Sequence, residues 1–451
     1  MLLALALFLL TPASDFQAGA SSVDITPPPG VPMAGYYYVR YNQGTHDPLH
    51  AKALVFEKDG AKAALVTLDL IGMPRDIVEK ARRLVEGLTG IPGAHLMISA
   101  THSHTGPELG GSRLRNVDPE AERKLSAWID ALPQKISDAV KKAEANLQPA
   151  SIKTATGHED SISFIRRFKM VDGSTGWNPG KLNPKIEAPI GTIDPAVPAL
   201  FIQNDKRHPI ATYVNFANHL DSVGGLRYSA DYPHTLSNVL NAAANDPAHV
   251  TLFSIGCAGN INHIDVRRAD PQKGDGEAAR IGGILAAAVL KSQPAAKPIA
   301  QGPLRTRSEL VKLPLAPYKP EEVAAAKEIL ANYGTPNARP FLDQVNAFKV
   351  LELEARAGKP IEAEVQSITL GTDLAIVGLP GEIFVDLGKA IKAGSKYRTT
   401  IVVELANGSI GYVPDRHAYA EGAYEVISSR VAAGSGELVV NAALRLLQSQ
   451  R

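Results

Sequence analysis

The chain has 451 residues, of which 45% are hydrophobic and 21% charged, and its formal net charge is +1. This composition is typical of a soluble globular protein, and its evenly mixed charges exclude the electrostatic footprint of a nucleic-acid-binding protein or of an anionic membrane surface binder. The length suggests about three domains. Because no low-complexity tract or Gly/Ser run separates two cores, we instead expect one large domain.

The N-terminus is predicted to be an export signal. Residues 2–10 are continuously apolar but too few to span a bilayer, and small residues follow at Ala13 and Ala18. We place a signal peptide at residues 1–18 and the folded domain at residues 19–451, so we expect a secreted or periplasmic protein without an integral membrane segment in its mature form. The alternative is an N-terminal core strand. The single cysteine, Cys257, excludes an internal disulfide framework.

Three β-hairpins are predicted from apolar runs that flank short turns. They span residues 53–69, 199–219 and 365–382, and their returning strands are expected to end at Asp69, His219 and Glu382. A fourth apolar strand over residues 250–255 leads into a Gly-rich loop at 256–260. Strands that each deliver one polar side chain to the same edge of a sheet can build a site.

Apolar residues at helical spacing predict seven helices between these strands. They cover residues 76–88, 119–147, 233–244, 277–291, 320–333, 340–357 and 436–448. Hairpins imply antiparallel pairs and strand–helix–strand units imply parallel ones, so the predicted fold is mixed α/β, with sheets covered by helices. A long segment rich in Gly, Pro and Asn, residues 169–194, is predicted to be a loop over a site.

Two histidines follow a predicted buried strand over residues 95–100. Because strand side chains alternate between faces, His102 and His104 are expected to project into the same space. His102, His219 and Glu382 come from different parts of the chain and form a workable ligand set for catalytic zinc. The alternatives are a hydrogen-bonded core residue for His219 and, for Glu382, a carboxylate that stabilises a helix N-terminus without a metal.

An ordered set of short motifs runs through nearly the whole mature chain. They lie at residues 18–19, 24–26, 33–36, 101–107 (Thr-His-Ser-His-Thr-Gly-Pro), 215–219, 256–260, 379–382 (Leu-Pro-Gly-Glu) and 407–412, followed by Tyr424-Glu425. Together they resemble the catalytic N-terminal domain of the neutral ceramidases, zinc amidases that cleave the N-acyl bond of ceramide.

The resemblance implies a role for each matching residue. Four residues would hold the zinc ion: His102, His219, Glu382 and Tyr412. His104 would lie beside the metal and carry a proton. Arg166, with Arg167 as the alternative register, and Tyr424 would contact the substrate, and the spacing between Tyr412 and Tyr424 matches the family.

Two features depart from the family. The ceramidases place a serine, proposed as nucleophile or transition-state stabiliser, where this chain has Asn262, and they continue into an immunoglobulin-like domain that we do not find in this sequence. Asn262 cannot attack a carbonyl, but it can donate a hydrogen bond to an oxyanion or close a turn. Cys257 is predicted to be a buried apolar side chain, because its motif is too short for a nucleophile elbow. The backbone N–H groups of the loop around it are the better oxyanion donors.

The sequence therefore predicts an exported zinc hydrolase of an amide bond, with a ceramide-like N-acyl lipid or a related small molecule as substrate. One alternative is a zinc esterase or phosphoesterase. A phosphoesterase normally needs further carboxylates for a second metal, and the chain offers Asp69 and Asp221. The other alternative is a non-catalytic lipid-binding relative, which would have lost part of the ligand set.

Overall fold

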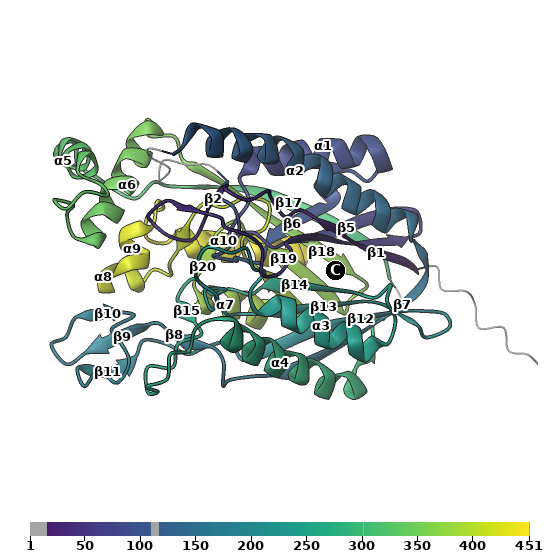
Figure 1. The fold of residues 1–451 in the computed structure, drawn as a ribbon. Helices are drawn as coiled ribbons and strands as arrows, with labels where there is room; N and C mark the ends of the chain where they lie inside the picture. Colours follow the sequence, from purple (N-terminus) through teal and green to yellow (C-terminus); the bar gives the residue numbers. More distant parts are fainter. Residues whose placement is uncertain (1–15, 110–116, 301, 451) are drawn as a thin grey trace, which may run out of the picture.

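The computed structural model describes residues 16–109, 117–300 and 302–450, and they form a mixed α/β fold of two stacked sheets between layers of helices (Figure 1). Parallel and antiparallel pairs occur in both of the larger sheets. The predicted fold class is confirmed. Within these residues, no helix is both long and apolar enough to cross a membrane.

The larger sheet has nine strands. Its order is β14-β13-β12-β7-β1-β4-β5-β6, with β16 beside β7. The strands are β1 (Phe16–Asp24), β4 (His50–Lys58), β5 (Ala61–Leu68), β6 (Leu96–Ala100), β7 (Gln148–His158), β12 (Ala196–Asn204), β13 (Pro209–Phe216), β14 (Val250–Ile255) and β16 (Lys297–Pro298). Pairs are antiparallel except β5–β6 and β13–β14, which are parallel because a helix connects the two strands of each pair.

The smaller sheet has the order β17-β18-β19-β21. Its strands are β17 (Leu304–Leu313), β18 (Ile361–Leu370), β19 (Leu374–Gly378) and β21 (Thr399–Val403), and the pair β19–β21 is parallel. One face of this sheet packs on the larger sheet. The shared core contains Leu54 and Leu200 from the larger sheet together with Ile368 and Ile401 from the smaller one.

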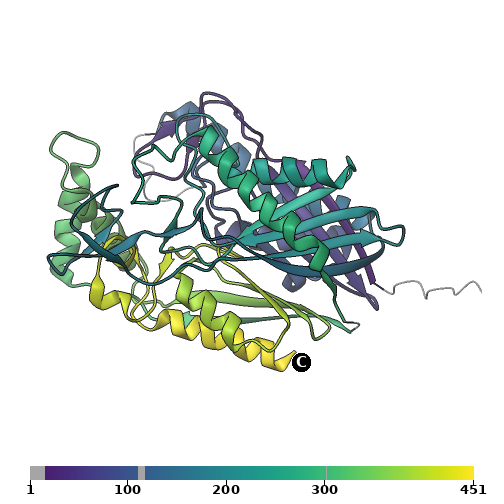
Figure 2. The same ribbon diagram turned by 90° about the horizontal axis from the view of Figure 1, so that it is seen from below.

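Helices cover the outer faces of both sheets. Over the larger sheet lie α1 (Arg75–Thr89), α2 (Pro119–Ala145), α3 (Tyr232–Ala244) and α4 (Asp275–Ser292). Over the smaller sheet lie α7 (Val385–Gly394) and α10 (Ser435–Ser449), the latter in yellow along one side of Figure 2. The remaining pair, α5 (Pro320–Ala331) and α6 (Phe341–Ala355), packs as a hairpin at one end of the molecule (Figure 1).

Short elements lie between the ends of the sheets and the helical hairpin. They are β2 (Pro32–Met33), β3 (Arg40–Tyr41), β8 (Phe164–Ile165), β15 (Ile261–Asn262), β20 (Glu382–Ile383), β22 (Tyr412–Val413), α8 (Ala418–Glu421) and α9 (Tyr424–Ser428). The segment expected to be a loop, residues 169–194, instead takes part in a three-stranded sheet of β9 (Arg167–Met170), β10 (Thr175–Trp177) and β11 (Ile186–Pro189). The small sheet pairs backbone N–H and C=O groups of this long segment, which is why the segment can be ordered although it is too long for a simple loop.

The predicted export signal lies almost entirely outside the described residues. Its last three positions, residues 16–18, are the first residues of β1, where Phe16 pairs with Lys58 and Ala18 with Phe56. The division at residue 18 therefore stays a prediction from sequence.

Candidate metal centre and active site

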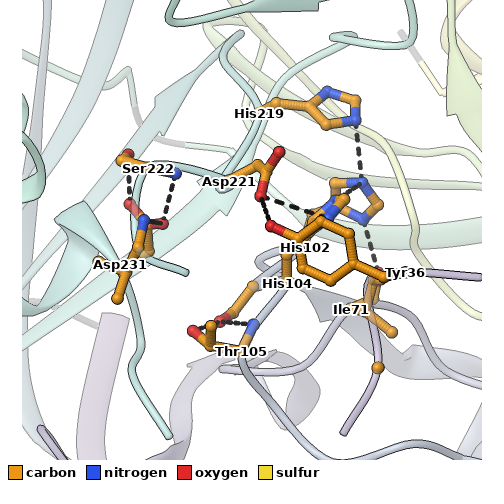
Figure 3. Close-up of polar contacts among 12 residues, drawn as sticks. Tyr36, Ile71, His102, His104, Thr105, His219, Asp221, Ser222 and Asp231 are labelled. Atoms are coloured by element: carbon orange, nitrogen blue, oxygen red, sulfur yellow. Dashed lines mark hydrogen bonds and ion pairs between the residues drawn. The ribbon is translucent and has the colours of Figure 1, made fainter. Parts of the chain in front are cut away.

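The two histidines of the His-x-His motif meet, but not by strand alternation. Strand β6 ends at Ala100, and His102 follows with a φ of 79°, a left-handed conformation that few non-glycine residues adopt. Its amide donates to the carbonyl of Leu70, while the amide of His104 donates to Leu220. This chain reversal brings the Nε2 atoms of His102 and His104 to 3.2 Å from each other (Figure 3).

His219 approaches the same point from another part of the large sheet. Strand β13 ends at Phe216, three residues earlier than the hairpin pattern predicts, and the loop that follows is buried. The Nε2 atom of His219 lies 3.1 Å from Nε2 of His102. Among the described residues, His102, His104 and His219 form a histidine group whose nearest ring nitrogens all lie within 4.8 Å of one another.

Glu382 and Tyr412 face the histidines from the smaller sheet. Glu382 does not end the returning strand as predicted, because β19 stops at Gly378 and Glu382 begins β20, which pairs in parallel with β22 at Tyr412. The Oε2 atom of Glu382 lies 3.5 Å from Nε2 of His102 and 3.6 Å from Nε2 of His219. Burial alone would raise the pKa of Glu382, but the two histidines and the Tyr412 hydroxyl hold it well below its ordinary value.

The hydrogen bonds of the His102 and His219 rings show which ring nitrogen carries the proton. Nδ1 of His102 is 2.7 Å from the carbonyl oxygen of Ile71, and Nδ1 of His219 is 3.1 Å from that of Ala258. Because a carbonyl only accepts, both rings carry their proton on Nδ1 and present an Nε2 lone pair.

These lone pairs converge with a buried Glu382 Oε2 that has no hydrogen-bond partner among the described residues. Three acceptors therefore meet at one point, and of the three the Nε2 atom of His219 also lies 3.3 Å from the Arg166 guanidinium. Imidazole nitrogens and a carboxylate are preferred ligands of zinc, and backbone carbonyls that orient the far ring nitrogens are typical supports of such ligands. The residues present fit a zinc ion.

Tyr412 completes the set that the family resemblance implies. Its side chain is 7% exposed, and the Arg166 guanidinium lies over its ring, 5.4 Å from the ring centroid. Burial, followed by the charge of Glu382, raises the pKa of Tyr412 well above its ordinary value despite the charge of Arg166, so the phenol is neutral unless a metal ion binds its oxygen.

Arg166, and not Arg167, faces the histidines. Its Nη1 lies 3.3 Å from Nε2 of His219 and its Nε donates to Glu425 at 2.8 Å. Arg167 turns away toward Glu425 and Glu421. The structure therefore favours the first of the two registers.

The Gly-rich loop supports the site with its carbonyls instead of its N–H groups. The amides of Gly256, Ala258 and Gly259 donate to Phe216, Glu404 and Ile383, so these three are not available to bind an oxyanion. The carbonyl of Ala258 accepts from His219, and that of Gly259 accepts from Arg166 at 2.6 Å. The loop therefore orients a histidine and an arginine.

Cys257 in this loop is buried against α7, where it contacts Gly388. Burial raises the pKa of its thiol well above the ordinary value. A neutral buried thiol is a poor nucleophile, so Cys257 belongs to the core, as the sequence predicts.

A cavity of about 780 Å³ is lined by His219 and Tyr412, and a second one of about 520 Å³, lined by His102 and Glu382, shares Tyr412 with it. Tyr424, predicted to contact substrate, lines the larger cavity and stacks on Trp177 with ring centroids 4.3 Å apart. Phe341 of the helical hairpin stacks next to both. The segment expected to cover a site does so, because Trp177 belongs to it.

Asn262 also lines this cavity, but part of its side chain is already engaged. Its Nδ2 donates to Asn178 Oδ1 at 2.8 Å, and its Oδ1 accepts from the amide of Ile264 at 3.0 Å. One of its two N–H bonds therefore braces the loop, and the other remains for a ligand.

Sequence reasoning missed the partners of His104. Tyr36 donates to Asp221 at 2.7 Å, and the same Oδ1 lies 3.8 Å from Nδ1 of His104 (Figure 3). Burial lowers the pKa of His104 to about 4, so its ring is neutral at pH 7. Their positions in the sequence could have indicated both residues, because Asp221 follows His219 by two residues and Tyr36 lies in one of the family motifs. Asp69, the other carboxylate considered for a second metal in a phosphoesterase, lies instead beside Lys52 and His50 in a separate pocket.

The stacked sheets, their helical layers and the buried histidine–carboxylate group define a large α/β protein with a candidate metal centre. Among solved structures, the chain is similar to the neutral ceramidase of Pseudomonas aeruginosa, with a TM-score of 0.74 and 21% identity, covering 96% of this chain and 75% of that one. It is also similar to a structure described as ceramidase complexed with C2, with a TM-score of 0.71, 19% identity and the same coverage. Scans against protein-family models and curated proteins give no match.

The resemblance to neutral ceramidases that the sequence motifs predict is therefore confirmed at the level of the fold. The fold likeness extends over nearly all of this chain.

Proposed function

We propose that this protein is a zinc-dependent hydrolase of an amide bond in a ceramide-like N-acyl lipid. The observation that supports this most is the convergence of two histidine lone pairs and a buried carboxylate at an aromatic-lined cavity. The ceramidase-like fold supports the choice of an amide over an ester or a phosphate. The placement of Asp69 away from the site removes one carboxylate that a second metal would need.

Zinc would be held by His102, His219, Glu382 and Tyr412. When bound, zinc polarises a carbonyl oxygen and makes a water molecule more acidic. Hydrolysis then adds water across the amide: the C–N bond breaks, and a fatty acid and an amine leave.

The chain's own residues would manage the proton and the carbonyl oxygen. His104 is neutral and lies beside Asp221, so it can take a proton from the attacking water and return it to the leaving nitrogen. Arg166 and Tyr424 face the cavity above the metal ligands and can donate hydrogen bonds to the carbonyl oxygen as it gains charge.

The zinc content of ligand variants tests this proposal. Purified wild type should contain about one zinc ion per chain, and His102→Ala or His219→Ala should lose it together with hydrolysis of N-acyl amides, since one missing ligand leaves an incomplete site. His158→Ala is the matched control, because His158 is exposed on β7. Full zinc occupancy in both ligand variants would overturn the metal assignment, and zinc-loaded wild type inactive on a panel of N-acyl lipids would overturn the substrate class.

A further inference from the structure

The larger of the two cavities carries more positive than negative side chains. Of its described lining residues, Asp221 is the only carboxylate, whereas Arg166, Lys181 and Lys273 are cations. Arg166 is neutralised by Glu425. Lys181 donates to the backbone carbonyls of Ala269 and Asp270 and forms no ion pair with a carboxylate of the described residues.

Asp221 cancels only part of this positive charge, because it is one carboxylate beside two lysines in the cavity lining. It accepts from the Tyr36 hydroxyl at 2.7 Å and lies 3.8 Å from Nδ1 of His104 (Figure 3). Although burial alone would raise the pKa of Asp221, His104, Tyr36 and Lys273 lower it. Lys273 itself is exposed, so its ammonium group is open to a ligand.

His263 adds an unfilled polar position on the same side of the cavity. The ring is 2% exposed, and its Nε2 lies 2.9 Å from the carbonyl oxygen of Gln272, so Nε2 carries the proton. Its buried Nδ1 has no partner among the described residues. Burial lowers the pKa of His263, so the neutral ring presents an Nδ1 lone pair that can accept a hydrogen bond from a ligand.

A different part of the cavity wall is apolar. Tyr424 stacks with both Trp177 and Phe341. Tyr37 meets Phe341 edge to face, with ring centroids 5.2 Å apart. Such a surface accepts a hydrocarbon chain. The cavity therefore pairs an apolar wall with a cationic one.

We propose that the amine side of the substrate carries a carboxylate, so that the preferred substrates are N-acyl amino acids. This inference rests on the proposed amide hydrolysis and names its substrate class. The acyl chain lies along the stacked aromatic rings, and the carboxylate faces Lys273 and Lys181.

Two amides of equal length but different head groups test the inference. The ratio of kcat/KM for N-palmitoylglycine to that for N-palmitoylethanolamine should be about tenfold or more in favour of the acid in zinc-loaded wild type, because tenfold corresponds to only about 1.4 kcal/mol. Lys273→Gln should lower this ratio about threefold or more, and Lys273→Arg should restore it. Lys185→Gln is the matched control, since Lys185 is exposed nearby but does not line the cavity.

A ratio of one or less in the wild type, or a ratio unchanged by Lys273→Gln, would overturn the inference. If neither amide is hydrolysed, the proposed function fails, and binding then decides the head-group preference separately. Trp177 lines the cavity, so its fluorescence reports binding of the two amides. Equal dissociation constants for the two amides would refute the carboxylate preference even without catalysis.

Discussion

His104 is held differently from the two histidines next to it. Backbone carbonyls accept from Nδ1 of His102 and His219, whereas Nδ1 of His104 has no hydrogen bond within the described chain and lies 3.8 Å from Asp221. A ring without a backbone anchor can exchange its proton between both nitrogens. This favours a proton carrier over a third histidine ligand.

His104→Gln should therefore keep its zinc while turnover falls roughly a hundredfold, the usual range for a general acid–base group. Metal analysis and steady-state kinetics on the same preparation check both parts. Zinc lost from the variant would make His104 a ligand, and unchanged turnover would leave it no catalytic role.

Asn262 has one structural contact and one N–H group that can make a catalytic contact. Its Nδ2 braces Asn178, and its second N–H is available to the developing oxyanion. If that contact operates, Asn262→Ala should lower kcat more than it raises KM, by roughly a hundredfold where such donors have been removed elsewhere. Without a hydroxyl at this position, we also expect no burst of product before steady turnover.

Asn262→Ser provides the comparison, because it returns a hydroxyl donor to the position. Wild-type rates in both variants would show that Asn262 only closes its turn. A covalent acyl adduct trapped on the wild-type protein would rule out direct attack by water.

The sequence reveals site residues that lie in local motifs, but not those that are placed by contacts between distant segments. His102, His219, Glu382 and Tyr412 lie in motifs with characteristic neighbours, and the structure brings all four together. Tyr36, Asp221, Glu425 and Trp177 act through contacts between segments more than 100 residues apart, and no local pattern encodes such contacts. The positive φ of His102 is likewise a product of the surrounding packing.

At the scale of elements, one buried ion pair joins helix α1 to the smaller sheet. Arg82 on α1 donates to both carboxylate oxygens of Glu364 on β18, at 2.8 and 3.2 Å, and also to the carbonyl of Leu96. Arg75 joins the same carboxylate. Burial alone would raise the pKa of Glu364, but the two arginines hold it below its ordinary value.

Glu364→Gln should lower the free energy of unfolding by about 3 kcal/mol, because it leaves Arg82 buried without its counter-charge. Glu362→Gln, an exposed position on the same strand, is the control and should change it by less than about 0.5 kcal/mol. Urea unfolding at pH 7 measures both.

The ion pair between Arg82 and Glu364 also makes the stability of the fold depend on pH. A carboxylate with a depressed folded-state pKa contributes stability above its unfolded pKa, about 4.3, and loses it as the pH falls through the lower folded value. The difference between wild type and Glu364→Gln should therefore be constant above pH 5 and shrink below pH 4. A difference that stays constant down to pH 3 would contradict the proposed pairing.

The predicted hairpins and helices could be found because their patterns are local, whereas two of the longest strands, β7 and β17, were not predicted. The three hairpins are present, as β4–β5, β12–β13 and β18–β19, and all seven predicted helices lie within a few residues of their expected bounds. The two-residue strands β20 and β22 could not be predicted from sequence, because only their pairing with each other defines them. The small sheet of β9, β10 and β11 could not be predicted either, since its Gly- and Pro-rich sequence resembles a loop.

At the scale of the whole molecule, the candidate metal site unites both sheets. His102 follows β6 and His219 follows β13 in the larger sheet, whereas Glu382 follows β19 and Tyr412 follows β21 in the smaller one. Each of these strands belongs to a parallel pair, and all four chain segments leave the carboxyl ends of those strands. The sequence could place the polar residues after strands, but only the packing of one sheet on the other decides that the four residues meet.

A bound zinc ion would therefore link the two sheets, and removing it should lower the stability of the whole fold. A ligand present at a hundredfold excess over its dissociation constant adds about 2.7 kcal/mol to the free energy of unfolding. For a chain of this size, we expect chelation to lower Tm by about 3 °C or more. Because His102→Ala should hold no zinc, its Tm should be lower already and should not respond to the chelator, whereas the His158→Ala control should respond as wild type does. Thermal unfolding followed by circular dichroism, with and without chelator and after zinc is added back, measures this. An equal shift in wild type and His102→Ala would mean that the chelator acts elsewhere, and no shift in a wild type shown to have lost its zinc would mean that the metal does not hold the two sheets together.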